Sequence, residues 1–123
     1  MRNQTISWAF LFLILCLSCQ SGENNKYIVG EWEKENWYVK QTQKPIAQTM
    51  HFQFDSLGEY SIDYGSEIEK GKYWINYGQL YTQEEGQNEK NVQIVRLDSN
   101  TLILEMNRSG QIEVLELKKR QIN

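Results

Sequence analysis

The sequence has few of the residues that build thiol, metal or acid–base sites. It contains two cysteines, one histidine and one proline. Both cysteines, Cys16 and Cys19, lie near the N-terminus, so the rest of the chain has no disulfide, thiolate nucleophile or cysteine metal site. The histidine, His51, stands opposite two phenylalanines in an alternating run and is expected to face solvent, which removes a Ser-His-Asp triad. We therefore expect no enzyme, no metal and no cofactor.

A positively charged surface is also missing. The formal net charge is −3, and it becomes −4 once Arg2 is removed with the leader described below. A nucleic-acid-binding domain carries a basic stripe, and a membrane-docking protein often carries a polybasic segment. Neither is present, so we expect no nucleic-acid partner. Any attachment to a membrane must come from the N-terminus.

Long apolar runs are absent except at the start of the chain. Ile6–Leu17 is apolar apart from Ser7, and it is shorter than the roughly 20 residues that span a bilayer. It follows the positive charge of Arg2 and precedes the small residue Ser18, which is the order of a signal peptide. Residues 1–18 are therefore expected to be removed.

The end of this leader, Leu17-Ser18-Cys19, resembles the lipobox of bacterial lipoproteins. The lipobox usually has leucine three residues before the cysteine, whereas this chain has Cys16 there. The resemblance implies cleavage before Cys19 and lipidation of its sulfur. The residues 20–27 that follow are polar and lack periodicity, so segment 19–27 is expected to be the lipidated cysteine and a flexible tether. The alternatives are an ordinary secretory signal peptide and a retained anchor. Localisation in the cell envelope, most simply at the outer membrane, follows from lipidation.

Short runs of alternating apolar and polar residues fill the chain from residue 28 to residue 120, separated by turn residues. This pattern predicts strands at 28–40, 50–54, 59–63, 71–75, 79–82, 92–97, 101–106 and 111–119. Tight connections make sequence neighbours pair, which gives an all-β, eight-stranded antiparallel up-and-down barrel with no free edge. The longest connection, Gln41–Thr49, is the expected helix or lid. A twisted sheet covered by a helix is the alternative.

The alternation divides the aromatic residues between two faces. Five are expected inside, where they would line a pocket for a small hydrophobic ligand or pack as core: Tyr38, Phe52, Phe54, Tyr60 and Tyr73. Trp37 and Trp74 fall on the outer face. They would form a patch for an envelope protein partner or be covered by Gln41–Thr49. Glu31, Glu33 and Glu35 also face outward and are expected to be solvated.

Several short motifs follow one another in an order that is familiar. Gly30-Glu31-Trp32 stands in the first strand and Arg120 at the end of the last. Between them come Phe52-Gln53-Phe54-Asp55, Gly71-Lys72-Tyr73 and Leu97-Asp98-Ser99-Asn100. This series resembles the lipocalin-like domain of bacterial lipoproteins, particularly those of the Bacteroidota. The resemblance implies that Trp32 closes one end of the barrel with Arg120 packed over it.

Together these observations predict a membrane-anchored, non-enzymatic lipoprotein whose barrel binds a small hydrophobic ligand. The alternative is a filled barrel that binds another envelope protein, in the manner of an inhibitor or immunity-type lipoprotein.

Overall fold

The computed structural model describes residues 25–121, so the predicted leader, Cys19 and most of the predicted tether lie outside the described residues. The described chain forms a one-turn helix followed by eight strands: Asn25–Ile28 (α2), Gly30–Val39 (β1), His51–Phe54 (β2), Glu59–Asp63 (β3), Ile68–Asn76 (β4), Gln79–Glu84 (β5), Lys90–Leu97 (β6), Thr101–Arg108 (β7) and Gln111–Lys119 (β8). None of the described helices is long and apolar enough to cross a membrane.

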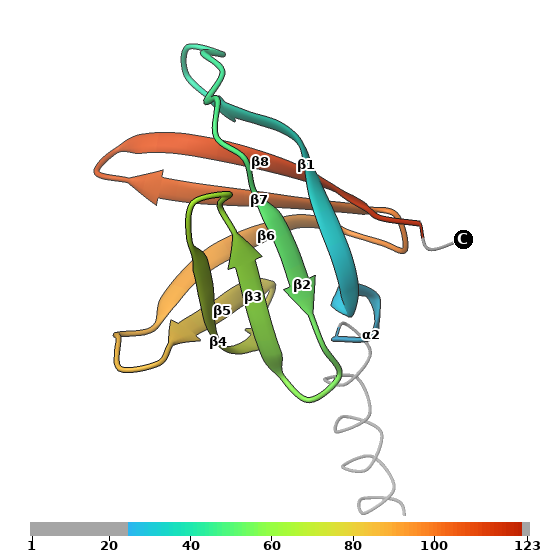
Figure 1. The fold of residues 1–123 in the computed structure, drawn as a ribbon. Coiled ribbons are helices and arrows are strands. Elements are labelled where there is room, and N and C mark those ends of the chain that lie inside the picture. The colour runs from blue at the N-terminus through green and yellow to red at the C-terminus, as the bar shows by residue number, and fades with distance from the viewer. Residues whose placement is uncertain (1–24, 122–123) are drawn as a thin grey trace, which may run out of the picture.

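The eight strands form a closed barrel in sequence order (Figure 1). Every strand pairs antiparallel with its sequence neighbours, and β1 completes the ring by pairing with β8. The predicted all-β, up-and-down barrel is therefore confirmed. Closure pairs the two strands that would otherwise be exposed edges.

The turns explain why sequence neighbours pair. In the β2–β3 turn, the Asp55 carboxylate accepts hydrogen bonds from the backbone N–H groups of Leu57 and Glu59, at 2.9 and 2.8 Å. Gly58 in the same turn has a φ of +85°, a conformation that glycine adopts without a steric penalty. These local contacts set the register of the β2–β3 hairpin.

One end of the barrel is closed by its own side chains. The largest fully buried residues are Trp32, Phe54, Ile28, Leu80, Leu102, Leu115 and Leu117, and all belong to one hydrophobic cluster. The Trp32 indole N–H donates to the backbone carbonyl of Ile28 at 2.8 Å. This bond ties α2 beneath the closed end and satisfies the one polar atom of the indole ring.

The predicted partner of Trp32 is wrong by one residue. The Lys119 Nζ atom lies 5.2 Å from the Trp32 ring centroid and donates to the Tyr27 carbonyl at 3.1 Å. Trp32 pairs with Lys119 across β1 and β8, so the following residue, Arg120, points to the outer face. There Arg120 lies 3.9 Å from the Glu31 carboxylate and 3.7 Å from that of Glu33. The cation over the indole is thus a lysine.

A β-bulge in β1 overturns two predicted orientations. The pairing with β8 shifts between Lys34 and Asn36, so Glu35 has no opposite residue. An extra residue in one strand reverses which side chains face inward beyond it. Trp37 is consequently inside the barrel and only 5% exposed, whereas Tyr38 lies on the outer face. The predicted inward Tyr38 and outward Trp37 were both wrong for this reason.

The Gln41–Thr49 segment is neither a helix nor a lid. After the turn that follows β1 it runs back beside that strand, with the Val39 N–H bonded to the Lys44 carbonyl and the Ile46 N–H bonded to the Trp37 carbonyl, both at 2.9 Å. These bonds satisfy the backbone as an extension of the β1–β2 hairpin.

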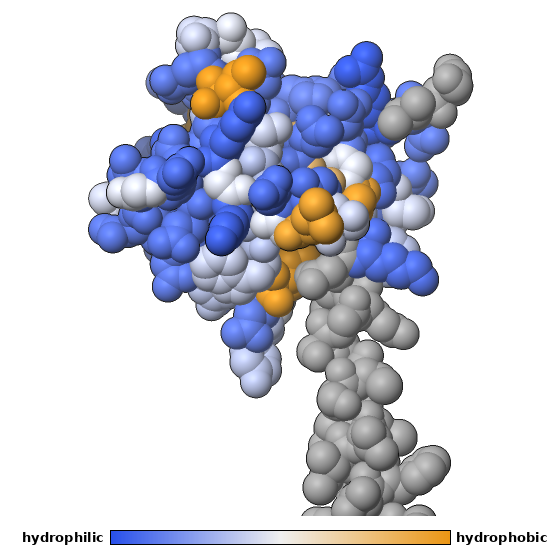
Figure 2. Space-filling model, turned by 60° about the horizontal axis from the view of Figure 1, so that its bottom comes forward, coloured by the Kyte–Doolittle hydropathy of each residue, from blue (hydrophilic) through white to orange (hydrophobic). Residues whose placement is uncertain are grey.

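The outer surface is mostly polar. His51 is half-exposed and lies opposite Glu33 and Asp63 in the flanking strands, as expected for an outward residue. Figure 2 shows a largely hydrophilic surface on which hydrophobic residues gather beside the point where the chain enters the barrel.

Candidate functional site

Four of the five predicted lining residues meet inside the barrel. The rings of Phe52 and Phe54 lie 5.9 Å apart, and Phe54 contacts Tyr73 edge-to-face at 4.9 Å. The Tyr73 hydroxyl donates to the Asp55 carbonyl at 2.5 Å, and Tyr60 pairs with Phe54 across β2 and β3. All four belong to the buried cluster, so they pack against other side chains of the core.

Polar groups replace this apolar core at the end of the barrel opposite α2. The Glu69 carboxylate on β4 accepts two hydrogen bonds from tyrosine hydroxyls, at 2.5 Å from Tyr60 and 3.0 Å from Tyr64. Glu69 shares the inner face of β4 with Gly71 and Tyr73, because these residues alternate along the strand. This carboxylate is therefore held in place before any ligand arrives.

A second polar group comes from the strands that face β4. Glu113 on β8 is only 4% exposed and accepts a hydrogen bond from the Trp37 indole at 3.1 Å. Arg108, at the end of β7, lies 3.6 Å from the Glu113 carboxylate and 5.9 Å from the Trp37 ring centroid. A buried carboxylate is tolerated when such partners surround it.

Arg108, from the second polar group, affects the pKa of Tyr64, from the first. Burial and the Glu69 carboxylate raise the pKa of Tyr64 far above its ordinary value, with a further rise from Glu84 and a lowering by Arg108. Residues of β4, β5 and β7 therefore influence one tyrosine just beyond β3. We call the set Trp37, Tyr60, Tyr64, Glu69, Glu84, Arg108 and Glu113 the mouth of the barrel.

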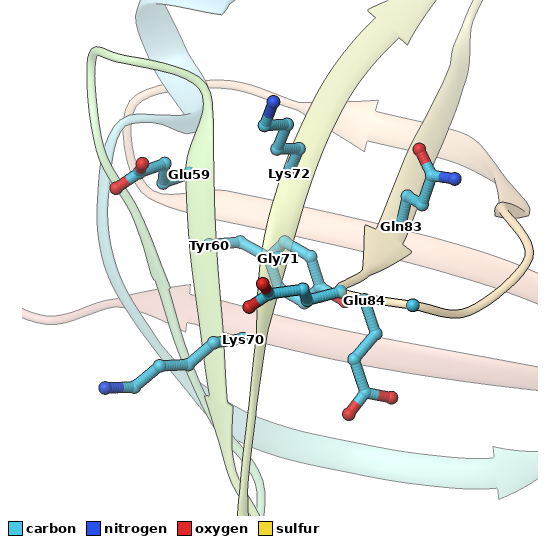
Figure 3. A pocket seen from close by; sticks show the side chains of 9 residues that line it. Glu59, Tyr60, Lys70, Gly71, Lys72, Gln83 and Glu84 are labelled. Atoms are coloured by element: carbon cyan, nitrogen blue, oxygen red, sulfur yellow. The ribbon is translucent and has the colours of Figure 1, made fainter.

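A pocket of about 610 Å³ opens on the side of the barrel next to the mouth. It is lined by Glu59, Tyr60, Lys70, Gly71, Lys72, Gln83, Glu84, Glu85 and Gly86. Figure 3 shows charged side chains of β3 and β4 projecting around Gly71, with Gln83 and Glu84 on β5. The pocket shares Tyr60 and Glu84 with the mouth, and its carboxylates and ammonium groups suit a polar group.

Sequence reasoning missed the charged half of the mouth. Alternation carries the inner face of β4 past Tyr73 and Gly71 to Glu69, and the inner face of β8 from Leu115 to Glu113. Either pattern could have placed these carboxylates inside. They were missed because a charged residue in an alternating strand is ordinarily the solvated one.

The tyrosines of the barrel give the protein a pH dependence. Burial first, then Glu69, raises the pKa of Tyr60, and burial followed by Asp55 raises that of Tyr73; Tyr64 is raised as described above. A pKa raised by folding favours the protonated phenol in the folded state. The resulting stability is complete below pH 10, the ordinary tyrosine value, and is lost as the pH rises above it.

We expect these three of the seven tyrosines to ionise only as the protein unfolds. Tyrosinate absorbance followed alongside circular dichroism measures this directly. Glu69→Gln removes a charge beside Tyr60 and Tyr64 but not beside Tyr73, so it should let two tyrosines ionise earlier. Ionisation of all seven near pH 10 in the folded protein would contradict the burial of these phenols.

The comparisons with known proteins agree with this architecture. The model of the family described as lipocalin-like domain matches residues 28–104. A lipocalin-like protein from Bacteroides uniformis superposes with a TM-score of 0.56 at 16% identity, covering 76% of this chain and 98% of that one. An uncharacterized protein from Bacteroides eggerthii superposes with a TM-score of 0.57 at 13% identity, covering 76% and 99%. At such identities the likeness shows the fold alone. No curated protein matches the sequence.

Proposed function

Because the chain belongs to the lipocalin-like domain family, we propose that it is a membrane-anchored, non-enzymatic protein that binds a small molecule at the mouth of its barrel. The observation that supports this most is the buried Glu113 carboxylate, held by Trp37 and Arg108 at the barrel end opposite α2. Small-molecule sites commonly combine aromatic walls with a few fixed polar groups.

The packing of the barrel favours a ligand site at the mouth and not deep inside the barrel. Trp32, Phe54 and Leu102 are fully buried at the closed end, where Phe52 pairs with Trp32 and Tyr73 packs edge-to-face on Phe54. A ligand therefore has to bind among the mouth residues, at the end of the barrel opposite α2. A mainly hydrophobic molecule with one or two polar groups fits best, because aromatic rings and charged groups alternate there.

The proposed anchor is Cys19, lipidated at its sulfur, with localisation at the outer membrane. The lipobox-like Leu17-Ser18-Cys19 supports this assignment, as does the polar stretch that follows it. Two or more acyl chains give stable attachment, whereas one chain gives marginal binding. The barrel would then act at a membrane surface.

Mass spectrometry of small molecules that copurify with the lipidated protein tests the binding proposal. We expect a molecule that is recovered with the wild type and with Arg96→Gln but is lost from Arg108→Gln. The two arginines are matched controls, since their side chains are 61% and 62% exposed and each lies beside one carboxylate. Arg96 lies in β6 beside the β6–β7 turn, away from the mouth.

Equal recovery from both variants, or no copurifying molecule under any growth condition, would overturn binding at the mouth.

A second candidate is binding of another envelope protein through the outer face, as an inhibitor or immunity-type lipoprotein would do. Trp74 on β4 favours it, because its ring stacks on that of Tyr81 at 5.5 Å with an angle of 2° between the planes. Stacked aromatic rings on an outer face are suited to a hot spot. Trp37 contributes nothing to this patch, since it is buried inside the barrel.

A further inference from the structure

The end of the barrel that carries α2 exposes large apolar side chains at its turns. Leu57, in the β2–β3 turn, is 85% exposed, and Tyr77, in the β4–β5 turn, is 97% exposed. Tyr27 in α2 is also exposed. Figure 2 shows hydrophobic residues gathered on this end of the barrel as well. Isolated exposed apolar residues are ordinary, but their gathering at one end indicates a contact surface.

A groove of about 450 Å³ runs through the same surface. It lies between α2, the β2–β3 turn and β4, and it is lined by Lys26, Val29, Ser56, Leu57, Gly58, Tyr73 and Trp74. Lys26 is the one charged residue among these lining positions. The groove thus presents aliphatic and aromatic groups beside a single ammonium group. Tyrosine and tryptophan are the residues enriched where protein meets the headgroup region of a bilayer.

The chain length places this end close to Cys19. Only residues 20–24 separate Cys19 from α2, and six residue steps span at most about 20 Å even when fully extended. The Trp32–Ile28 and Lys119–Tyr27 hydrogen bonds fix α2 against the closed end. A lipid on Cys19 would therefore bring the Leu57 and Tyr77 turns, and no other end of the barrel, to the membrane.

We propose that the α2 end of the barrel docks on the lipid surface that holds the anchor. This docking rests on the lipidation of Cys19 in the proposed function. Leu57 and Tyr77 enter the headgroup region, and Trp74 lies at its edge beside Lys26. Apolar contact drives the docking, because Lys26 is the one charged residue among the positions that line the groove. The mouth, at the opposite end, then faces away from the membrane and receives its ligand from the aqueous side.

The test uses the lipidated full-length protein in vesicles of phosphatidylethanolamine and phosphatidylglycerol. Metabolic labelling with palmitate in the wild type and in Cys19→Ala first establishes the anchor. The mature chain has no cysteine except Cys19, so a single introduced thiol can carry an environment-sensitive fluorophore. Leu57→Cys and Tyr77→Cys place it on the proposed surface, and Ser66→Cys places it in the β3–β4 turn at the other end.

We expect fluorophores at positions 57 and 77 to shift to shorter emission wavelengths and to be quenched by spin-labelled lipids. The fluorophore at position 66 should do neither. Adding Leu57→Glu should abolish the shift at position 77, while the matched Ser66→Glu should leave it unchanged. Both positions are exposed turn residues, so neither charge disturbs the core.

Two results overturn the docking and are distinguishable. If palmitate marks Cys19 but the fluorophores at 57 and 77 stay in water, the docking fails and the anchored binding protein stands. If palmitate labels the wild type and Cys19→Ala alike, or labels neither, the anchor itself fails, and the docking fails with it.

Discussion

Trp32→Ala is expected to lower the free energy of unfolding by about 3–5 kcal/mol, enough to leave a domain of this size marginal or unfolded. Trp32 is fully buried at the closed end, where its large side chain fills the space between the strands. Alanine would leave a cavity there, and the Ile28 carbonyl would lose its 2.8 Å hydrogen bond. Loss of that bond also removes one of the two hydrogen bonds that fix α2 against the barrel.

Urea denaturation followed by circular dichroism measures this cost. Trp32→Phe separates its two parts, because phenylalanine keeps most of the apolar volume but cannot donate to Ile28. The free energy of unfolding of Trp32→Phe should lie between those of the wild type and Trp32→Ala. Trp74→Ala is the matched control, since Trp74 is half-buried on the outer face, and it should cost far less. A Trp32→Ala protein as stable as Trp74→Ala would show that Trp32 does not close the barrel.

The strand pattern of the barrel was predictable because period-two alternation and turn chemistry are local properties. Phe52 and Phe54 alternate with His51 and Gln53, and the structure keeps that division of faces. Asp55 and Gly58 mark the β2–β3 turn in the sequence and make it in the structure. Nothing distant has to be known to place such hairpins.

The bulge at Glu35 was not predictable by the same rule, since alternation assumes that every strand residue has one opposite partner. Nothing in Lys34-Glu35-Asn36 is characteristic of a bulge. The clue is of longer range: Trp32 and Trp37 stand an odd number of residues apart, and both are large enough to require burial. Satisfying both within one strand demands an extra residue between them. Inside-outside predictions beyond residue 35 therefore failed for Trp37 and Tyr38 together.

The mouth was hidden for an energetic reason. Glu69 and Glu113 stay inside only because tyrosine hydroxyls, an indole and an arginine compensate their loss of water. Those partners lie in β1, in β7, in β3 and just after β3, so no single stretch of sequence contains them together. The cation packed on Trp32 was predicted to be Arg120 and is Lys119. The reason is related, since only the β1–β8 register decides which of the two faces Trp32.

Gly71→Ala is the second substitution with a large expected effect, and its sign is informative. Gly71 is in the middle of β4 and has no positive φ, so backbone propensity alone would make alanine stabilising by about 0.5–1 kcal/mol. The close approach of the β5 backbone predicts the opposite, that alanine destabilises the protein. A Cβ at this position would stand 2.1 Å from the Gln83 carbonyl oxygen and 2.8 Å from the Glu84 Cα. Both are backbone atoms of the paired strand β5.

Such a clash cannot be relieved by turning a side chain; β4 and β5 have to separate where they pair. The cost should reach about 3 kcal/mol, at or above the usual range for overpacking, because ladder hydrogen bonds weaken together with the packing. Gly86→Ala is the matched control: it has a φ of +79° and open space around it, so it should cost about 1–2 kcal/mol from conformation alone. Urea denaturation of the two variants measures which of them loses more free energy of unfolding. If Gly71→Ala proves more stable than the wild type, β5 does not pass this close to β4, and the pocket beside Gly71 must have another shape.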